Sequence, residues 1–202
     1  MTSITHYFSV YPDNMTKRNY IHRLLLTSIC LLPLTTMAHA QLLDFTNPLT
    51  VNALRVVNDN VMGGVSKSHF TYDPEGIVFE GEVSLDNGGG FASVRSPILI
   101  PNCTSALDVT FRGDAKNYKL VLRTDNASRS PLYQADFTTT REWQTHRFVP
   151  SDFKASFRGR TVNAPELVFS SVLEIGVLIA NQQAGTFRLQ LKNIQSISEK
   201  SC

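Results

Sequence analysis

The sequence is poor in the residues that most often mark a chemical site. Its 202 residues include three cysteines, five histidines and one tryptophan. Neither an H-E-x-x-H pattern nor a G-x-S-x-G pattern occurs, so two common hydrolase signatures are missing. Closely spaced Cys and His pairs, which mark zinc sites, are missing as well. We therefore expect a protein that is not an enzyme and has no catalytic residues, no cofactor and no transition-metal site.

Three kinds of site that leave no linear signature stay open. His69 and Ser66 could meet an acidic side chain in space and form a triad. Two carboxylates held about 5 to 9.5 Å apart would suit an enzyme acting on an envelope polysaccharide. Oxygen ligands from separate loops could gather around a calcium ion. Sequence spacing decides none of these three.

The apolar run at residues 24–34 is too short to span a membrane, which takes about 20 residues. Basic residues precede it, at Lys17, Arg18 and Arg23, and the small-residue sequence A-H-A follows it. This order is typical of a cleaved export signal. We expect residues 1–40 to be a signal peptide, with Met15 as the favoured start, and the product to be periplasmic or secreted.

An excess of charge of one sign is also lacking. The predicted leader holds three of the 19 Lys and Arg residues and one of the 17 Asp and Glu residues. The predicted mature chain, residues 41–202, is therefore formally neutral, which argues against nucleic-acid binding. Its length suits one domain with its own core.

Two cysteines, Cys103 and Cys202, lie in the predicted mature chain. An oxidising compartment would permit them to form a disulfide. The alternative is a partly buried Cys103 and a free Cys202 near the end of the chain.

What the mature chain has in abundance is short runs in which apolar and polar residues alternate. Tyr118, Leu120 and Leu122 share one face of a predicted strand over residues 118–124, and residues 186–194 repeat the pattern. Many short strands without intervening helices indicate an antiparallel sandwich. We predict an all-β, two-sheet antiparallel jelly-roll β-sandwich. Its other strands are expected at 54–57, 69–72, 76–84, 91–100, 106–112, 132–137, 143–149 and 172–180.

The most unusual local sequence is NDNVMGGVSKS, residues 58–68. Adjacent glycines allow positive φ or a close backbone approach, and polar side chains on such a loop suit recognition of another molecule. The alternative is a tight turn in which Asp59 or Asn60 binds its own backbone. The candidate binding residues here are Asn58, Asp59, Met62, Gly63, Gly64 and Ser66.

Further candidates are Asn87, in a second glycine-rich loop, and the pair Arg158 and Arg160. Two guanidinium groups beside a glycine could clamp a carboxylate or phosphate. Internal salt bridges to Asp152 or Asp59 are the alternative. Trp143 is expected in or beside the core rather than exposed to stack on a sugar.

Several segments together resemble a known family. VVNDNVMGGVSKSHF (56–70), NGGGFASVRS (87–96) and RGDAKNYKLVLRT (112–124) are similar to signatures of the complex I intermediate-associated protein 30 family. YQADF (133–137), the strand that follows Trp143, FRGR (157–160) and AGTFRLQLKNI (184–194) follow in the family's order. The resemblance implies a galactose-binding-like jelly roll and a non-catalytic assembly chaperone that binds incomplete complexes. The predicted export signal leaves the partner open.

The leading interpretation is therefore a non-catalytic interaction module that binds a protein partner or assembly intermediate. We expect the loops at 58–66, 87–90 and 158–160 to form one polar surface for it. The alternative is a carbohydrate-binding module of the cell envelope.

Overall fold

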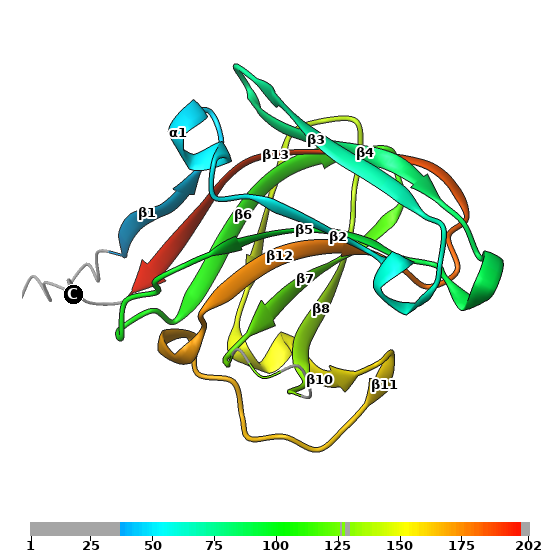
Figure 1. Cartoon of the computed structure of the whole chain (residues 1–202). Coiled ribbons are helices and arrows are strands. Elements are labelled where there is room, and N and C mark those ends of the chain that lie inside the picture. The colour runs from blue at the N-terminus through cyan, green and yellow to red at the C-terminus, as the bar shows by residue number, and fades with distance from the viewer. Residues whose placement is uncertain (1–36, 126, 128–129, 199–202) are drawn as a thin grey trace, which may run out of the picture. The chain divides into compact units, whose positions relative to one another are not determined.

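A computed structural model describes residues 37–125, 127 and 130–198. All of them lie within one compact unit, residues 35–202. Figure 1 shows two stacked β-sheets, the architecture expected from the alternating sequence pattern. Every strand pair is antiparallel. The fold is therefore the predicted all-β jelly-roll sandwich.

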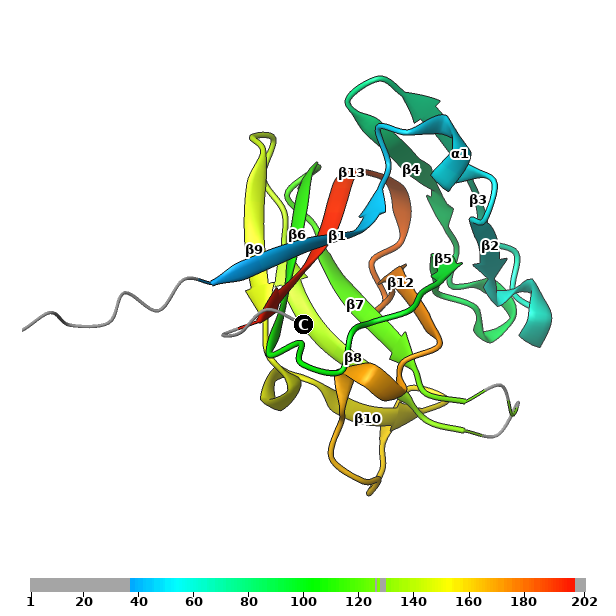
Figure 2. The same ribbon diagram turned by 90° about the vertical axis from the view of Figure 1, so that its left-hand side faces the viewer.

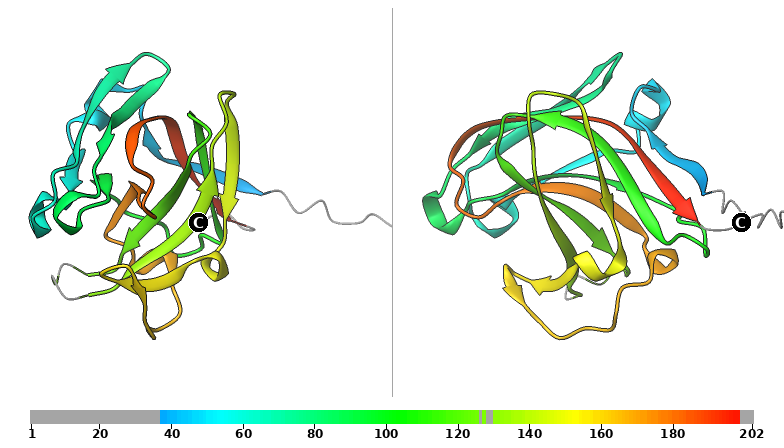
Figure 3. Two further views of the ribbon diagram at one scale, coloured as in Figure 1. Left: turned by 90° about the vertical axis from the view of Figure 1, so that its right-hand side faces the viewer. Right: turned by 180° about the vertical axis from the view of Figure 1, so that it is seen from behind.

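Sheet A has the order β3-β4-β13-β6-β9, with β1 paired to β13. Its strands are β1 (Ala38–Asp44), β3 (Lys67–Asp73), β4 (Gly76–Val83), β6 (Ala106–Gly113), β9 (Gln144–Phe148) and β13 (Gly185–Ser198). The long strand β13 crosses the whole sheet in the rear view of Figure 3.

Sheet B has the order β11-β10-β8-β7-β12-β5-β2. Its strands are β2 (Arg55–Asn58), β5 (Ala92–Pro97), β7 (Asn117–Arg123), β8 (Leu132–Thr138), β10 (Lys154–Phe157), β11 (Arg160–Thr161) and β12 (Glu174–Ile179). Short helical turns connect the strands: α1 (Pro48–Val51), η1 (Asp59–Met62), η2 (Asp86–Gly88), η3 (Pro150–Asp152) and η4 (Phe169–Ser171).

The core lies between the sheets and is built from the inward face of each strand. Tyr118, Leu120 and Leu122 of β7 are buried as predicted, and so are the alternate apolar residues of β13. Successive side chains of a strand point to opposite faces, so the intervening residues lie on the outer faces. Trp143 is half-buried on the outside of sheet A, with the Arg112 guanidinium carbon 4.6 Å from its ring centroid.

All ten predicted strands are present, but sequence analysis missed β1, β10 and β11. The first of these, β1, pairs with the end of β13 (Figure 2), Ala38 opposite Ser198 and Ala40 opposite Ser196. Cleavage after Ala40 would remove the first three residues of β1 and leave residues 41–44 paired. The signal peptide and its boundary stay predictions, because residues 1–36 lie outside the described part of the chain.

The register of β6 on β13 bears on the predicted disulfide. Ser105 donates its backbone N–H to the Ile197 carbonyl at 2.8 Å, and Cys103 precedes Ser105 by two residues. The start of β6 thus lies beside the last described residues of the chain, at the end of β13. Cys202 lies outside the described residues, so its pairing with Cys103 stays a prediction. Across the described residues, no helix is long and apolar enough to cross a membrane.

Candidate functional site

Two loops at one end of the sandwich lie together. Residues 59–66 join β2 to β3 and begin with η1, whereas residues 84–91 join β4 to β5 and contain η2. Both are seen at the right-hand end of Figure 1. We call these two loops the tip.

The carboxylate of Asp59 ties the two loops of the tip to each other. Only 1% of Asp59 is exposed. Its Oδ1 accepts the Ser66 backbone N–H at 3.0 Å, and its Oδ2 accepts the Gly90 N–H at 2.6 Å, the Phe91 N–H at 3.3 Å and the Ser66 hydroxyl. The Ser66 Oγ in turn accepts the Ser84 N–H at 3.0 Å. One buried anion therefore satisfies donors from both loops.

The glycines of the tip make room for this carboxylate. A Cβ on Gly64 would lie 2.4 Å from Asp59 Cγ, and a Cβ on Gly89 would lie 2.6 Å from Asp59 Oδ2. Real Cβ contacts are not that short, so both positions need glycine. The M-G-G and N-G-G-G sequences thus serve one shared structural purpose.

The hydrogen bonds also set the ionisation of Asp59. Burial alone would raise its pKa, but bonds from the Ser66 hydroxyl and from the Gly90, Phe91 and Ser66 amides outweigh that effect and lower the pKa below the ordinary 3.8. The side chain is therefore an anion at neutral pH.

The tip presents apolar side chains to solvent. Val61 is 70% and Met62 60% exposed, and Val65 and Leu85 are also exposed. Three of the four belong to the first loop and Leu85 to the second. Apolar residues that gather on the surface of a monomer often mark a partner-binding site, and these four stand on loops that Asp59 holds in place.

The predicted residues of the tip divide into two groups. Asp59, Gly64 and Ser66 are buried, and Asn58 is half-buried with its Oδ1 accepting the Ser68 hydroxyl at 2.5 Å. Met62, Gly63 and Asn87 are exposed. The Asp59 and Ser66 side chains thus form their hydrogen bonds within the protein. This arrangement is close to the alternative of a tight turn, but Asp59 binds the backbone of the second loop as well as that of its own loop.

Sequence reasoning missed Val61, Val65 and Leu85. A signal was present, because these apolar residues stand in loops where no strand alternation explains them. Composition could not show that the loops of residues 61 and 85 are neighbours.

Arg158 and Arg160 are not part of the tip. They flank Gly159 in the β10–β11 hairpin, where Arg158 (φ 49°) and Gly159 (φ 76°) both have positive φ, as a two-residue hairpin turn requires. Both arginines are exposed, and none of the ion pairs among the described residues involves either one.

The expected single polar surface is not formed. The β10–β11 hairpin lies at one edge of sheet B and β2 at the other. Five strand spacings of about 4.8 Å separate β10 from β2, roughly 24 Å. The hairpin and the tip are far apart because five strands of sheet B separate the two edges at which they lie. The sequences of the loops do not contain this strand order. A ligand at Arg158 would be distant from the tip.

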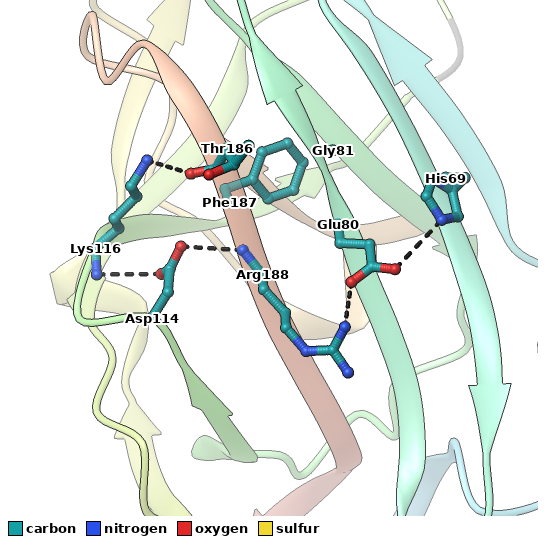
Figure 4. A pocket seen from close by; sticks show the side chains of 8 residues that line it. All are labelled: His69, Glu80, Gly81, Asp114, Lys116, Thr186, Phe187 and Arg188. Carbon is teal, nitrogen blue, oxygen red and sulfur yellow. Dashed lines mark hydrogen bonds and ion pairs between the residues drawn. The ribbon is translucent and has the colours of Figure 1, made fainter.

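A separate groove of about 590 Å³ lies on the outer face of sheet A (Figure 4). It is bounded by β3, β4, β13 and the β6–β7 turn. Its lining residues are His69, Glu80, Gly81, Asp114, Lys116, Thr186, Phe187 and Arg188.

Charges within the groove pair with one another. Glu80 accepts a bond from the Arg188 guanidinium and lies 3.4 Å from His69 Nε2. Asp114 accepts the Arg188 backbone N–H at 3.0 Å and the Tyr118 hydroxyl at 3.0 Å. Burial, and then the charge of Asp114, raise the pKa of Tyr118 far above its ordinary value. The groove is thus largely self-neutralised.

The structure separates the two residues of the triad that sequence left open. His69 faces Glu80 in the groove, whereas Ser66 is bonded to Asp59 inside the tip. Among the described residues, no three His, Cys, Asp or Glu side chains gather as metal ligands.

Comparison with known families decides the chain's relationship. The profile of the family described as complex I intermediate-associated protein 30 matches residues 43–191. The chain belongs to this family. The tip loops and the groove lie within the region that this intermediate-associated protein 30 match covers. Both sheets lie within it too, except for the first residues of β1 and the last residues of β13. No curated protein sequence matches the chain.

Solved structures with a similar fold include a family 11 carbohydrate-binding module from Clostridium thermocellum in complex with a β-1,3-1,4-mixed-linked tetrasaccharide. It is 13% identical with a TM-score of 0.52, covering 78% of this chain and 95% of that one. The solution structure of CtCBM11 is 14% identical with a TM-score of 0.54, covering 81% and 96%. The agarase AgWH50C is 10% identical with a TM-score of 0.51, covering 81% of this chain but 25% of the agarase. At these identities the likeness concerns the fold alone.

We predict that Asp59→Asn destabilises the protein by about 3 kcal/mol, because an amide cannot accept all four bonds and its NH₂ would face N–H donors. Urea unfolding followed by fluorescence measures the change. Asp86→Asn removes the same charge from an exposed position of the tip and is expected to change stability by less than about 0.5 kcal/mol. Equal effects of the two substitutions would contradict the role of Asp59.

The lowered pKa of Asp59 predicts a pH dependence. A carboxyl whose pKa is lower in the folded state stabilises the protein fully above its unfolded value, near 3.8, and this contribution is lost as pH falls through the folded value. The stability gap between wild type and Asp59→Asn should stay constant from pH 7 to about pH 4 and shrink only below. Urea unfolding at each pH measures it, and a gap that closes between pH 7 and pH 5 would refute the lowered pKa.

Proposed function

We propose that this intermediate-associated protein 30 family member is a non-catalytic module that binds a protein partner through the tip. The observation that supports this most directly is the set of exposed apolar side chains, Val61, Met62, Val65 and Leu85, on two loops that Asp59 joins. The family name fits association with assembly intermediates. The predicted export signal would place this activity in the periplasm or outside the cell.

The rigidity of the tip supports binding in physical terms. A loop that orders only on binding loses conformational entropy, which weakens the complex. Here the loops are ordered by internal hydrogen bonds before any partner arrives, since Asp59 and Ser66 satisfy backbone groups of both. Burying Val61 and Met62 against a partner would then contribute hydrophobic free energy, about 25 cal/mol per Å² of apolar area.

The predicted outcome is that a Val61→Asp, Met62→Asp double variant captures its specific partners at least tenfold less than wild type. Quantitative mass spectrometry of proteins co-purified from envelope extract measures this. Leu49→Asp is the matched control, because Leu49 is 75% exposed on α1, away from the tip. Both variants should unfold at the wild-type urea concentration. Identical partner lists from wild type and double variant would refute a binding role of the tip.

A second candidate function is glycan binding in the groove of Figure 4. The groove offers Glu80, Asp114, Lys116 and Arg188 as hydrogen-bonding groups for hydroxyls, and the sandwich resembles that of carbohydrate-binding modules. The groove lies on sheet A, so this function would use a different surface from the tip.

If this second function holds, a glycan array should give specific signals that Glu80→Ala weakens at least tenfold and that the tip double variant leaves unchanged. Glu82→Ala is the matched control, since Glu82 is an exposed residue of the same strand outside the groove lining. An array without signal above background, with and without calcium, would reject it.

A further inference from the structure

The outer face of sheet B carries an unusual cluster of charges. The register places Arg55 directly opposite Arg95 across β2 and β5, and Glu174 opposite Arg123 across β12 and β7. Like charges in opposite positions of neighbouring strands destabilise a sheet. We call Arg55, Arg95, Arg123 and Glu174 the cationic cluster.

One carboxylate serves all three guanidinium groups. Glu174 Oε2 accepts the Arg55 Nε–H at 3.1 Å and a second bond from Arg55 Nη2. Its Oε1 lies 3.4 Å from Arg95 Nη1 and 3.6 Å from Arg123 Nε. Arg123 Nε is buried without a hydrogen-bond acceptor among the described residues. The cluster thus has more donors than Glu174 can satisfy.

The four residues carry three positive charges and one negative charge. Only 8% of the Arg95 side chain is exposed, against 52% for Arg55. Burial lowers the pKa of Arg95, Glu174 opposes the shift, and the charges of Arg123 and Arg55 add to it. Repulsion among the arginines is therefore only partly offset within the protein.

Neighbouring acids do not balance the cluster. The outward residues of β2, β5, β7, β8 and β12 include two acids, Glu174 and Asp136, and Asp136 pairs with Lys119. The pKa of Asp125, in the loop after β7, is lowered mainly by hydrogen bonds from Ser130 and Ala127. The charge of Arg123 lowers it further and is the smallest of the causes. The oxygens of Asp125 accept those two hydrogen bonds, whereas the ion pair of Arg123 is with Glu174.

The cationic cluster is continuous with the tip. Arg55 begins β2, and the last residue of that strand leads directly into η1 with Val61 and Met62. Asp59 lies four residue steps along the chain from Arg55, about 13 Å in an extended strand. An ordinary protein interface buries about 800 Å² on each side, so one partner can cover both.

The chemistry of this face favours a peptide over a sugar. Aromatic rings, on which sugars stack, do not face outward here: Tyr118, Tyr133 and Phe137, the aromatic residues of these five strands, all lie in the core. Apolar side chains of the tip stand beside the charges instead. Guanidinium groups bind carboxylates in a planar, two-bond geometry.

We propose that the cationic cluster receives a carboxylate from an acidic segment of the protein partner, next to the apolar contacts of the tip. This inference rests on the proposed protein-binding function and names the chemistry of the partner. The added carboxylate would accept from the exposed part of the Arg55 guanidinium, and it would reduce the excess positive charge of the cluster.

The test uses the purified protein and a fluorescein-labelled octaglutamate peptide, with octaglutamine as the uncharged probe, by fluorescence anisotropy at low salt. We expect octaglutamate to bind and octaglutamine not to bind, and we expect the affinity for octaglutamate to fall as the salt concentration rises. An Arg55→Gln, Arg123→Gln double variant should raise its Kd at least tenfold. Arg141→Gln, an exposed arginine outside sheet B, should leave it unchanged.

Glu174→Gln provides a gain-of-function test that a purely structural cluster would not pass. Removing the one carboxylate raises the net charge of the cluster, so octaglutamate should bind several-fold more tightly, provided that circular dichroism shows a folded variant. If this variant does not fold, the double arginine variant still decides. No octaglutamate binding, or equal binding of octaglutamine, would overturn the proposal.

Competition distinguishes a protein carboxylate from other anions, and partner capture by the variants distinguishes the acidic contact from the binding role of the tip. Tetragalacturonate or inorganic phosphate displacing the peptide at lower concentration than free octaglutamate would overturn the assignment to a protein segment. Partner capture that is lost in the Val61→Asp, Met62→Asp variant but unchanged in the double arginine variant would retain the tip and refute the acidic contact.

Discussion

The arrangement of the tip depends on one buried carboxylate. Asp59 reaches from the start of η1 to amides 31 and 32 residues further along the chain, so it joins the two loops beyond the point where the pairing of β2 with β5 ends. The bonds that hold this anion also require glycine at positions 64 and 89, where a Cβ would collide with it. The tip thus exposes Val61, Met62, Val65 and Leu85 for contact with other molecules, beside the polar side chains of Asn60, Asp86 and Asn87.

The two outer faces of the sandwich differ in how their charges are balanced. In the groove of sheet A, Glu80 and Arg188 pair, and Asp114 accepts neighbouring donors. On sheet B, Glu174 is the one carboxylate among the described residues that forms ion pairs with the three arginines. A self-neutralised groove suits neutral polar groups, whereas an excess of guanidinium groups suits an anion. Charge balance, more than shape, separates the ligands that these two faces would favour.

The sequence allowed the fold to be predicted because one side of nearly every strand is buried, and burial leaves a period of two in the residue pattern. The prediction failed where this cause is weak. The two-residue strand β11 is too short to show a period, β10 has four residues, and β1 overlaps the small-residue end of the predicted leader. The glycine-rich loops were recognised as unusual, but their reason was not, because it lies in a contact between Asp59 and Gly90. The cationic cluster was out of reach for the same reason, since it requires the pairing of β2, β5, β12 and β7.

Fold likeness does not choose among ligands for this chain. Carbohydrate-binding modules with 13 to 14% identity share the sandwich, but a shared scaffold fixes only where strands and loops lie, and the side chains on them decide what is bound. Here strands β2, β5, β7, β8 and β12 of sheet B keep their aromatic rings in the core, and they direct arginines outward. Beside them, the tip exposes Val61 and Met62. Apolar contact flanked by unbalanced positive charge is the pattern that an acidic protein surface complements, because such a partner offers both carboxylates and apolar side chains on one chain.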